Sequence, residues 1–196
     1  PNNPTGTLLK LEDIEKICKN FRGIVVLDEA YIEFASQASF VARIKDFENI
    51  IVLRTFSKAW GLACIRVGYA VGNTDIIGYL NKIKPPYNLN RVSAKIALEA
   101  LGRSSKMFEF RDKILKERAR LADGLGILGF EVYPSEANFL LVRYPSLSAI
   151  AKRLADEFGI IIRDFGSQPL LKDCARISVG APNENGALLT TLKKIL

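Results

Sequence analysis

The sequence predicts an α/β protein with two domains, a portion of a mainly parallel sheet with flanking helices followed by a small α+β domain. Two continuous apolar runs, residues 24–27 and 51–53, are typical of parallel strands that are covered on both faces. Helical patterns alternate with these runs, and toward the C-terminus short strand patterns alternate with helical ones. We expect residues 1–102 to form the first domain and 103–196 the second, with a long bridging helix at about 106–128.

The first domain is expected to open with a turn and a helix. The hexapeptide PNNPTG (residues 1–6) supplies the residue types that turns require. Apolar residues then recur at helical spacing before Gly23 ends the helix: Leu11, Ile14, Ile17, Cys18 and Phe21. The strand at 24–27 follows. The other elements expected here are a helix within 37–47, strands at 50–53 and 67–71, a helix over 76–83 with Thr74 as N-cap and Pro85-Pro86 as its stop, and a helix at 92–101.

The second domain is expected to follow a helix from 107 to 128 that is charged on one face. Its predicted strands are 131–132, 139–142, 160–162 and 176–179, and its predicted helices are 146–158 and 184–195. We find no internal repeat and no low-complexity segment.

Composition excludes several classes of function. The 196 residues are 48% apolar and 25% charged, which is typical of a folded globular protein. The net charge of +7 would permit nucleic-acid binding, but basic residues are mixed with acidic ones, as in DKILKERAR (112–120), so we do not expect it. The chain has no histidine, which excludes Ser-His-Asp and Cys-His catalysis and most zinc sites. We therefore expect no metal.

The cysteines and the hydropathy indicate where the protein works. Cys18, Cys64 and Cys174 are widely spaced and form no CxxC motif, so they are typical of reduced thiols. No apolar stretch approaches the length of a membrane span, and no signal peptide opens the chain. We expect a cytoplasmic protein without a membrane partner.

A lysine in the turn after the second strand is the strongest chemical signal. Lys58 follows the strand within TFSK (55–58), where loss of water would lower its pKa and favour imine formation. Thr55, Ser57 and Arg66 are suited to hold a phosphate beside it. An amine that condenses with an aldehyde next to an anion site is what pyridoxal 5'-phosphate requires. Asp28 ends the first strand, at the edge where α/β sheets bind ligands.

Several motifs together resemble the fold-type I, class II pyridoxal-phosphate-dependent aminotransferases, most closely the histidinol-phosphate branch. They are NPTG near the start, LDEAY (27–31), TFSKAWGLACIRVG (55–68), GIIIRDF (159–165), SQPLLKDCA (167–175) and ARISVG (175–180). Cys64 departs from the pattern because glycine, alanine or serine is normal there, and we expect little disturbance from it. The members of this family are considerably longer, so we expect the chain to be the C-terminal part of such an enzyme, with 1–102 completing the cofactor-binding large domain, and to be inactive alone.

The resemblance implies a role for each matching residue. Lys58 would hold the cofactor and then act as general base, Asp28 would pair with the pyridine nitrogen, and Tyr31 and Asn3 would contact the ring hydroxyl. The expected cofactor-binding set is Asn3, Asp28, Tyr31, Thr55, Ser57, Lys58 and Arg66. Arg163 would meet the substrate's phosphate or its surroundings, and Arg176 would take an α-carboxylate. Glu29 receives no role, and Asn138 matches a family position that could equally cap a strand.

The resemblance also implies a reaction. It is the transfer of an amino group between L-histidinol phosphate and 2-oxoglutarate, giving imidazole acetol phosphate and glutamate, in histidine biosynthesis. The enzyme would be a homodimer. The alternatives are another enzyme on the same scaffold, such as a threonine-phosphate decarboxylase or an aromatic amino-acid aminotransferase, and a non-enzymatic pyridoxal-binding regulator.

Overall fold

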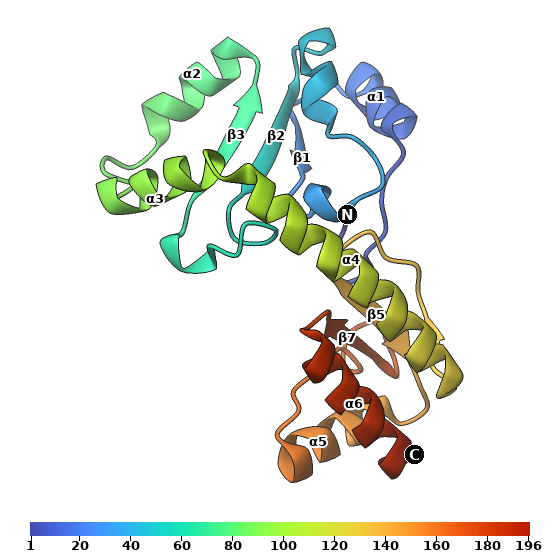
Figure 1. Cartoon of the computed structure of the whole chain (residues 1–196). Helices are drawn as coiled ribbons and strands as arrows, with labels where there is room; N and C mark the ends of the chain where they lie inside the picture. The colour runs from blue at the N-terminus through green and yellow to red at the C-terminus, as the bar shows by residue number, and fades with distance from the viewer. The chain divides into compact units, whose positions relative to one another are not determined.

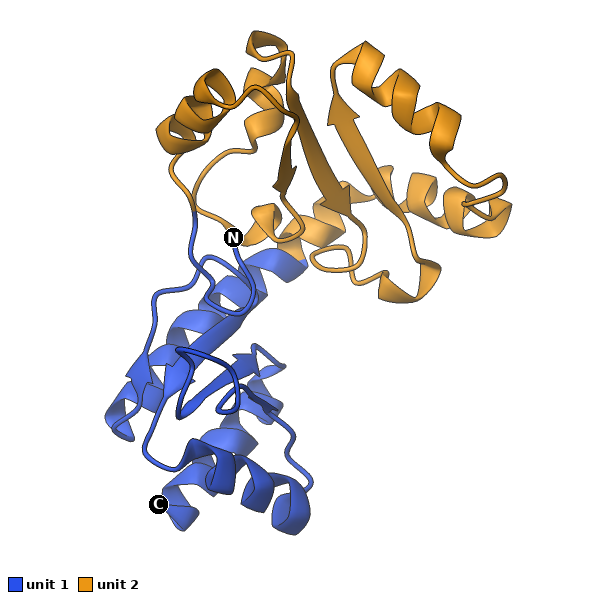
Figure 2. Ribbon diagram, turned by 180° about the vertical axis from the view of Figure 1, so that it is seen from behind, with its two compact units in different colours: residues 1–8, 110–196 blue, residues 9–109 orange.

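The chain forms two compact units in the computed structural model, which describes all 196 residues (Figure 2). One unit contains Leu9–Glu109, here called the sheet-edge unit. The other contains Pro1–Leu8 together with Phe110–Leu196, here called the C-terminal unit.

The sheet-edge unit is built on a three-stranded sheet in the order β1-β2-β3 (Figure 1). β1 (Val25–Asp28) pairs in parallel with β2 (Ile50–Thr55), and β2 pairs antiparallel with β3 (Gly68–Gly72). The predicted parallel arrangement therefore holds for one of these two strand pairs. The helical elements are α1 (Leu11–Asn20), α2 (Thr74–Ile83), α3 (Arg91–Leu101) and the 3-10 helices η1 (Ile32–Phe34), η2 (Phe40–Asp46) and η3 (Ala63–Ile65).

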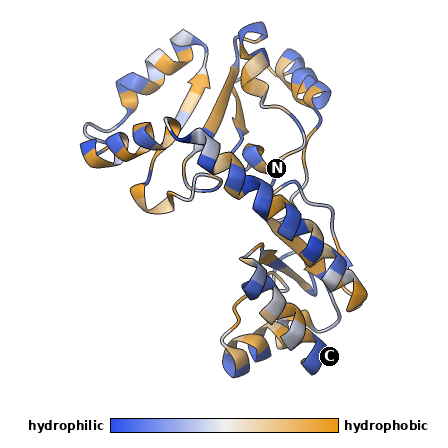
Figure 3. Cartoon of the chain, in the orientation of Figure 1, coloured by the Kyte–Doolittle hydropathy of each residue, from blue (hydrophilic) through white to orange (hydrophobic).

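A small core joins α1 and η2 to the sheet. The buried side chains of this cluster are Ile14, Cys18, Phe40, Ile50 and Val52. Figure 3 shows β2 in the hydrophobic colour, whereas α1 carries both colours, as expected of a helix with one buried face. Asn49 directly precedes β2. Its side-chain amide donates to the carbonyls of Cys18, Phe21 and Gly23 and so fixes the C-terminal end of α1.

Of two local predictions in this unit, the helix within 37–47 is confirmed and the N-cap at Thr74 is wrong. The helix expected within 37–47 is the 3-10 helix η2, which Ser39 caps by accepting the Val41 N–H at 3.1 Å. The N-cap of α2 is Asn73 rather than Thr74, because the Asn73 side-chain oxygen accepts the Asp75 N–H at 2.8 Å.

The C-terminal unit is an antiparallel sheet with helices. Its strands are β4 (Glu131–Val132), β5 (Phe139–Arg143), β6 (Arg163–Asp164) and β7 (Cys174–Ser178), in the order β4-β5-β7-β6. Helices α5 (Leu147–Phe158) and α6 (Pro182–Ile195) belong to it, as does most of α4 (Ser104–Ile127). Side chains from α4, α5, α6 and the two central strands form its core, with Leu121, Leu154 and Val142 fully buried. No helix of the chain has the length and apolar composition needed to cross a membrane.

The strand predicted at 160–162 is wrong, and the strand in that region is β6 at Arg163–Asp164. Gly159 ends α5 in the left-handed conformation with φ 66°, and its N–H donates to the Ala155 carbonyl. The Ile160 N–H donates to the Leu154 carbonyl and completes this helix ending. Ile160 and Ile162 pack against the core of the unit. The apolar run that resembles a strand is therefore the segment that follows the C-terminal end of α5.

The first eight residues lie with the C-terminal unit, although the sequence placed them in the first domain. The Glu136 N–H donates to the Gly6 carbonyl at 2.9 Å. Gly6 has φ +73°, and a Cβ atom there would lie 2.4 Å from the Ser135 hydroxyl oxygen. Only glycine permits this close approach. The turn at 1–6 therefore packs against Ser135 and Glu136, which precede β5.

Asn185 joins two elements of the C-terminal unit. It is 3% exposed, and its amide donates to Glu117 Oε2 at 2.8 Å and to the Gly180 carbonyl at 2.9 Å. Its oxygen accepts the Gly180 N–H at 3.0 Å. Hydrogen bonds from Arg120 and from Asn185 hold the pKa of Glu117 below its ordinary value.

We expect Asn185→Ala to lower the free energy of unfolding by about 2 kcal/mol, because it leaves buried polar groups without partners. Urea denaturation followed by circular dichroism measures this loss. Asn183→Ala is the matched control, because Asn183 is exposed in the same helix, and it should change stability by less than about 0.5 kcal/mol. Equal losses in both variants would show that the buried amide contributes nothing specific.

Candidate functional site

The candidate site lies where β1 and β2 end. Their parallel pairing places Asp28 opposite Leu53, so the residues that follow both strands meet at one edge of the sheet. A cavity of about 330 Å³ opens there. It is lined by Asp28, Ala30, Leu53, Arg54, Thr55, Ser57, Lys58 and Arg66. The structure thus brings together five of the seven residues predicted to bind the cofactor, namely Asp28, Thr55, Ser57, Lys58 and Arg66.

The turn after β2 is fixed by its own hydrogen bonds. Thr55 Oγ1 accepts the Ser57 N–H at 3.0 Å and donates to the Val67 carbonyl at 3.4 Å. The Phe56 side chain is buried and packs on Trp60 with ring centroids 5.3 Å apart. This internal bonding explains how a short turn can present Ser57 and Lys58 toward the same cavity.

Lys58 lies in this turn with an exposed side chain, so burial by this chain does not strip it of water as the sequence analysis expected. Lys58 Nζ lies 5.1 Å from the centroid of the Tyr31 ring, within the range of a cation–π contact. Tyr31 itself is buried, which gives the lysine one well-placed neighbour.

Asp28 and Arg66 supply opposite charges to the cavity. Asp28 Oδ1 accepts the Ala30 N–H at 2.9 Å, so a tight turn sets the direction of its carboxylate. Arg66 adopts the left-handed conformation with φ 57° and ψ 42°, and it donates to the Ala63 carbonyl at 3.0 Å. A non-glycine residue in this conformation costs about 1 kcal/mol or more, and such strain is common at functional sites.

Asn3, Arg163 and Arg176 belong to the C-terminal unit, whereas Tyr31 belongs to the sheet-edge unit. Arg163 and Arg176 face each other as direct partners in the antiparallel pair of β6 and β7. Asn3 Oδ1 accepts a hydrogen bond from Arg176 Nη1 at 2.7 Å. Asn3 is therefore placed beside a predicted substrate arginine, in a different unit from Lys58 and Asp28. Its predicted contact with the cofactor ring stays a prediction.

The paired arginines form a cationic patch with little internal compensation. Like charges directly opposite each other in a sheet are destabilising. The Arg176 guanidinium lies 5.2 Å from the Phe139 ring centroid, and its buried Nε has no hydrogen-bond partner. Arg163 is exposed, with its guanidinium 5.9 Å from the Phe165 ring centroid. Such a pair is suited to bind an anion, which would relieve the repulsion.

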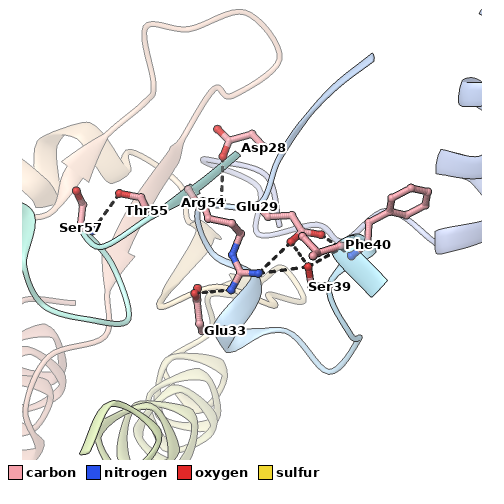
Figure 4. A network of polar contacts seen from close by, with 10 residues as sticks. Asp28, Glu29, Glu33, Ser39, Phe40, Arg54, Thr55 and Ser57 are labelled. Carbon is pink, nitrogen blue, oxygen red and sulfur yellow. Dashed lines mark hydrogen bonds and ion pairs between the residues drawn. The ribbon is translucent and has the colours of Figure 1, made fainter. Parts of the chain in front are cut away.

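A buried ionic network beside the cavity was not predicted from the sequence (Figure 4). Arg54 Nη2 donates to Glu33 Oε1 at 2.7 Å, and Arg54 Nη1 lies 3.5 Å from Glu29 Oε2 and 3.3 Å from the Ser39 hydroxyl. Burial opposes the charge of Arg54, but its hydrogen bond to Glu33 and the charges of Glu33, Tyr69 and Glu29 outweigh burial and raise its pKa. The sequence offers only a weak signal, because Glu29 lies inside LDEAY and Arg54 directly precedes TFSK, while their pairing depends on strand register.

The chain matches known proteins along its whole length. The family model for aminotransferase class I and II matches residues 1–192. A histidinol-phosphate aminotransferase of Parabacteroides distasonis is 45% identical over 197 residues, which cover all of this chain and 57% of that relative. The chain thus spans about half the length of the curated relatives it matches.

Solved structures give the same result. The histidinol-phosphate aminotransferase of Sinorhizobium meliloti, in complex with pyridoxal-5'-phosphate, has a TM-score of 0.90 and 31% identity, with 99% of this chain and 55% of that chain covered. The L-threonine-O-3-phosphate decarboxylase of Porphyromonas gingivalis has a TM-score of 0.88 and 26% identity, covering 99% of this chain and 62% of that chain. From its sequence and its fold, the chain belongs to the class I and II aminotransferase family.

Proposed function

We propose that the complete protein is a pyridoxal-phosphate-dependent aminotransferase that exchanges an amino group between L-histidinol phosphate and 2-oxoglutarate. The observation that carries the proposal is the cavity at the end of β1 and β2, where an amine, a carboxylate and a guanidinium meet. These groups come from Lys58, Asp28 and Arg66. The reaction class is supported by the P. distasonis and S. meliloti proteins, whose names state that activity.

The residues around the cavity fit pyridoxal 5'-phosphate. An aldehyde requires a primary amine, which Lys58 provides. A pyridine nitrogen requires a carboxylate, and a phosphate requires a cation and hydroxyl donors, which are present in Asp28, Arg66 and Ser57. When bound, the cofactor supplies an aldehyde and a cationic ring that delocalises negative charge from the substrate's Cα.

The chain's own residues divide the remaining work. Lys58 is the base that would take a proton from the substrate's Cα and return one, since it is the amine of the cavity. Asp28 would keep a proton on the ring nitrogen by charge pairing. Thr55 contributes indirectly, because its hydroxyl accepts the Ser57 N–H and thus holds the turn. The Tyr31 ring would keep the Lys58 ammonium near the cavity when the lysine is charged.

The cationic patch of Arg163 and Arg176 suits the substrates. Both partners of the proposed reaction carry anions, a phosphate on one and carboxylates on the other. We assign the phosphate end to Arg163 and the α-carboxylate to Arg176, whose guanidinium Asn3 already orients. Homodimerisation remains a proposal that rests on membership of the family.

A threonine-phosphate decarboxylase is the second candidate. The P. gingivalis enzyme of that name shares the fold along nearly all of this chain. A phosphorylated amino acid would use the same two cationic residues. The two reactions differ in whether the amino group is transferred or carbon dioxide is released.

We expect glutamate to remove the absorbance of the bound cofactor's aldehyde form in the complete protein. Imidazole acetol phosphate should restore it, because its amination regenerates the aldehyde. The measurement is a two-step absorbance titration, with Lys58→Ala as the variant that should fail in both steps. No restoration by imidazole acetol phosphate, together with restoration by phosphate-free keto acids other than 2-oxoglutarate, would contradict the assigned substrate. No change with glutamate despite bound cofactor would remove the transaminase proposal. Release of carbon dioxide from threonine phosphate would favour the second candidate.

We expect Arg66→Gly to separate stability from cofactor binding. Glycine relieves the left-handed backbone and should raise the free energy of unfolding of the cofactor-free protein by about 1 kcal/mol. Loss of the guanidinium should weaken pyridoxal 5'-phosphate binding by about tenfold or more. Urea denaturation and a fluorescence titration measure the two effects. Arg66→Ala is the control, because it should lose affinity without gaining stability; a gain in both variants would show that the backbone is not strained.

We expect Arg163→Gln to discriminate between the two substrates. The KM for imidazole acetol phosphate should rise by about tenfold or more, since a charge-assisted contact is lost, while the KM for glutamate should change little. Steady-state kinetics with each substrate varied provides the measurement. Arg153→Gln is the matched control, because Arg153 pairs with Glu157 on the exposed face of α5. An equal rise for both substrates would contradict the phosphate assignment.

A further inference from the structure

The buried network around Arg54 is a cluster of charged groups to which no role has been assigned. The side chains of Arg54, Glu29 and Glu33 are 16%, 5% and 7% exposed. One guanidinium therefore serves two buried carboxylates. Arg54 Nε is buried without a hydrogen-bond partner, so the network is not arranged for the greatest stability.

The network connects the two segments that carry the reactive groups. Arg54 precedes Thr55, the first residue of the TFSK turn, and it lines the cavity itself. Glu29 directly follows Asp28. Figure 4 shows the Arg54 guanidinium between Glu33 on one side and the Glu29–Ser39 pair on the other.

The two carboxylates lie on either side of Tyr31 in the sequence. Glu29 and Glu33 are each two residues away from it, and Tyr31 is the N-cap position of η1, which contains Glu33. A backbone hydrogen bond also joins the segment 29–33 to β2, because the Glu29 N–H donates to the Leu53 carbonyl at 2.9 Å. A guanidinium that binds both carboxylates fixes the segment between them, and hence the Tyr31 ring that lies 5.1 Å from Lys58 Nζ.

The far side of the network is anchored as well. Glu29 accepts hydrogen bonds from the Ser39 hydroxyl at 2.5 Å and from the Phe40 N–H at 2.7 Å. Phe40 is fully buried in the core that joins η2 to the sheet. These hydrogen bonds anchor Glu29 to the core, and Glu29 in turn contacts Arg54. The position of Arg54 therefore does not depend on solvent-exposed groups.

We propose that Arg54 is a positioning residue that fixes Tyr31 and Asp28 relative to Lys58 by holding Glu29 and Glu33 with separate nitrogens. The forked guanidinium is essential to this role, because a single ammonium lacks the rigid geometry that reaches both carboxylates. The consequence for catalysis rests on the proposed function, whereas the coupling of the two segments does not.

The test compares one chemical change at two ion pairs of the same unit. Arg54→Lys keeps the charge and removes the fork. Arg43→Lys is the matched control, because Arg43 also pairs with a glutamate, Glu15, but its side chain is 42% exposed and lies away from the cavity. Hydrogen–deuterium exchange of the complete, cofactor-free protein reports the order of residues 29–34 and 55–58. Binding of pyridoxal 5'-phosphate is then followed by absorbance.

In Arg54→Lys we expect exchange in both segments to accelerate by about tenfold or more, and cofactor affinity to fall by a similar factor. Arg43→Lys should leave both segments and the affinity unchanged. Glu33→Gln is a second, milder variant that should accelerate exchange around Tyr31 should Arg54→Lys fail to fold.

Three results would overturn the proposal. They are an unchanged cofactor affinity in Arg54→Lys, an unchanged exchange rate in both segments of that variant, and equal effects of the Arg54 and Arg43 variants. If the unaltered protein binds no cofactor, the proposed function fails, while the exchange comparison still decides whether Arg54 couples the segments.

Discussion

The parallel pairing of β1 and β2 is the constraint on which the candidate site depends. Its register places Asp28 opposite Leu53 and therefore beside the start of the lysine turn. A slip of one residue would turn Asp28 to the other face of the sheet and separate the carboxylate from the amine. The core below the strands fixes this register, because Ile50 and Val52 are fully buried against Phe40. Apolar packing thus sets the distance between Asp28 and the lysine turn, although neither belongs to that core.

The site concentrates features that weaken a fold. Arg66 holds a left-handed backbone, Arg54 is a buried cation with an unpaired Nε, and Glu29 is a carboxylate with 4% exposure. Each is held by neighbours: the Ala63 carbonyl bonds the Arg66 side chain, and the Phe40 N–H bonds Glu29. Left-handed residues also occur outside the site, at Tyr87, Ser146, Leu170 and Asp173, so this backbone strain alone does not mark the site. The site differs in combining such strain with largely buried charges.

Sequence reasoning predicted the features that depend on residues close together in the chain, and it did not predict contacts between residues far apart in the chain. Apolar runs identified β1 and β2, and local residue types identified the Lys58 turn, because these features depend on neighbours in sequence. The Ile160–Ile162 run was misjudged since a helix ending and a strand share apolar residues. The pairing of Arg176 with Asn3 joins residues 173 positions apart, and the Arg54 network joins two strand ends. No spacing rule could have found either contact, since both follow from tertiary folding.

In the proposed function, the two compact units carry different parts of the chemistry. The sheet-edge unit carries Lys58, Asp28 and Arg66, which suit the cofactor whatever amine is processed. The C-terminal unit carries Arg163 and Arg176 on one strand pair, which suit the anions of the substrate. On this proposal, substitutions near β6 would change the substrate without disturbing the strand register that sets the amine beside the carboxylate. An aminotransferase and a decarboxylase, both named for phosphorylated substrates, match this one chain with TM-scores of 0.90 and 0.88, which a fold that leaves the choice of reaction to a few side chains would allow.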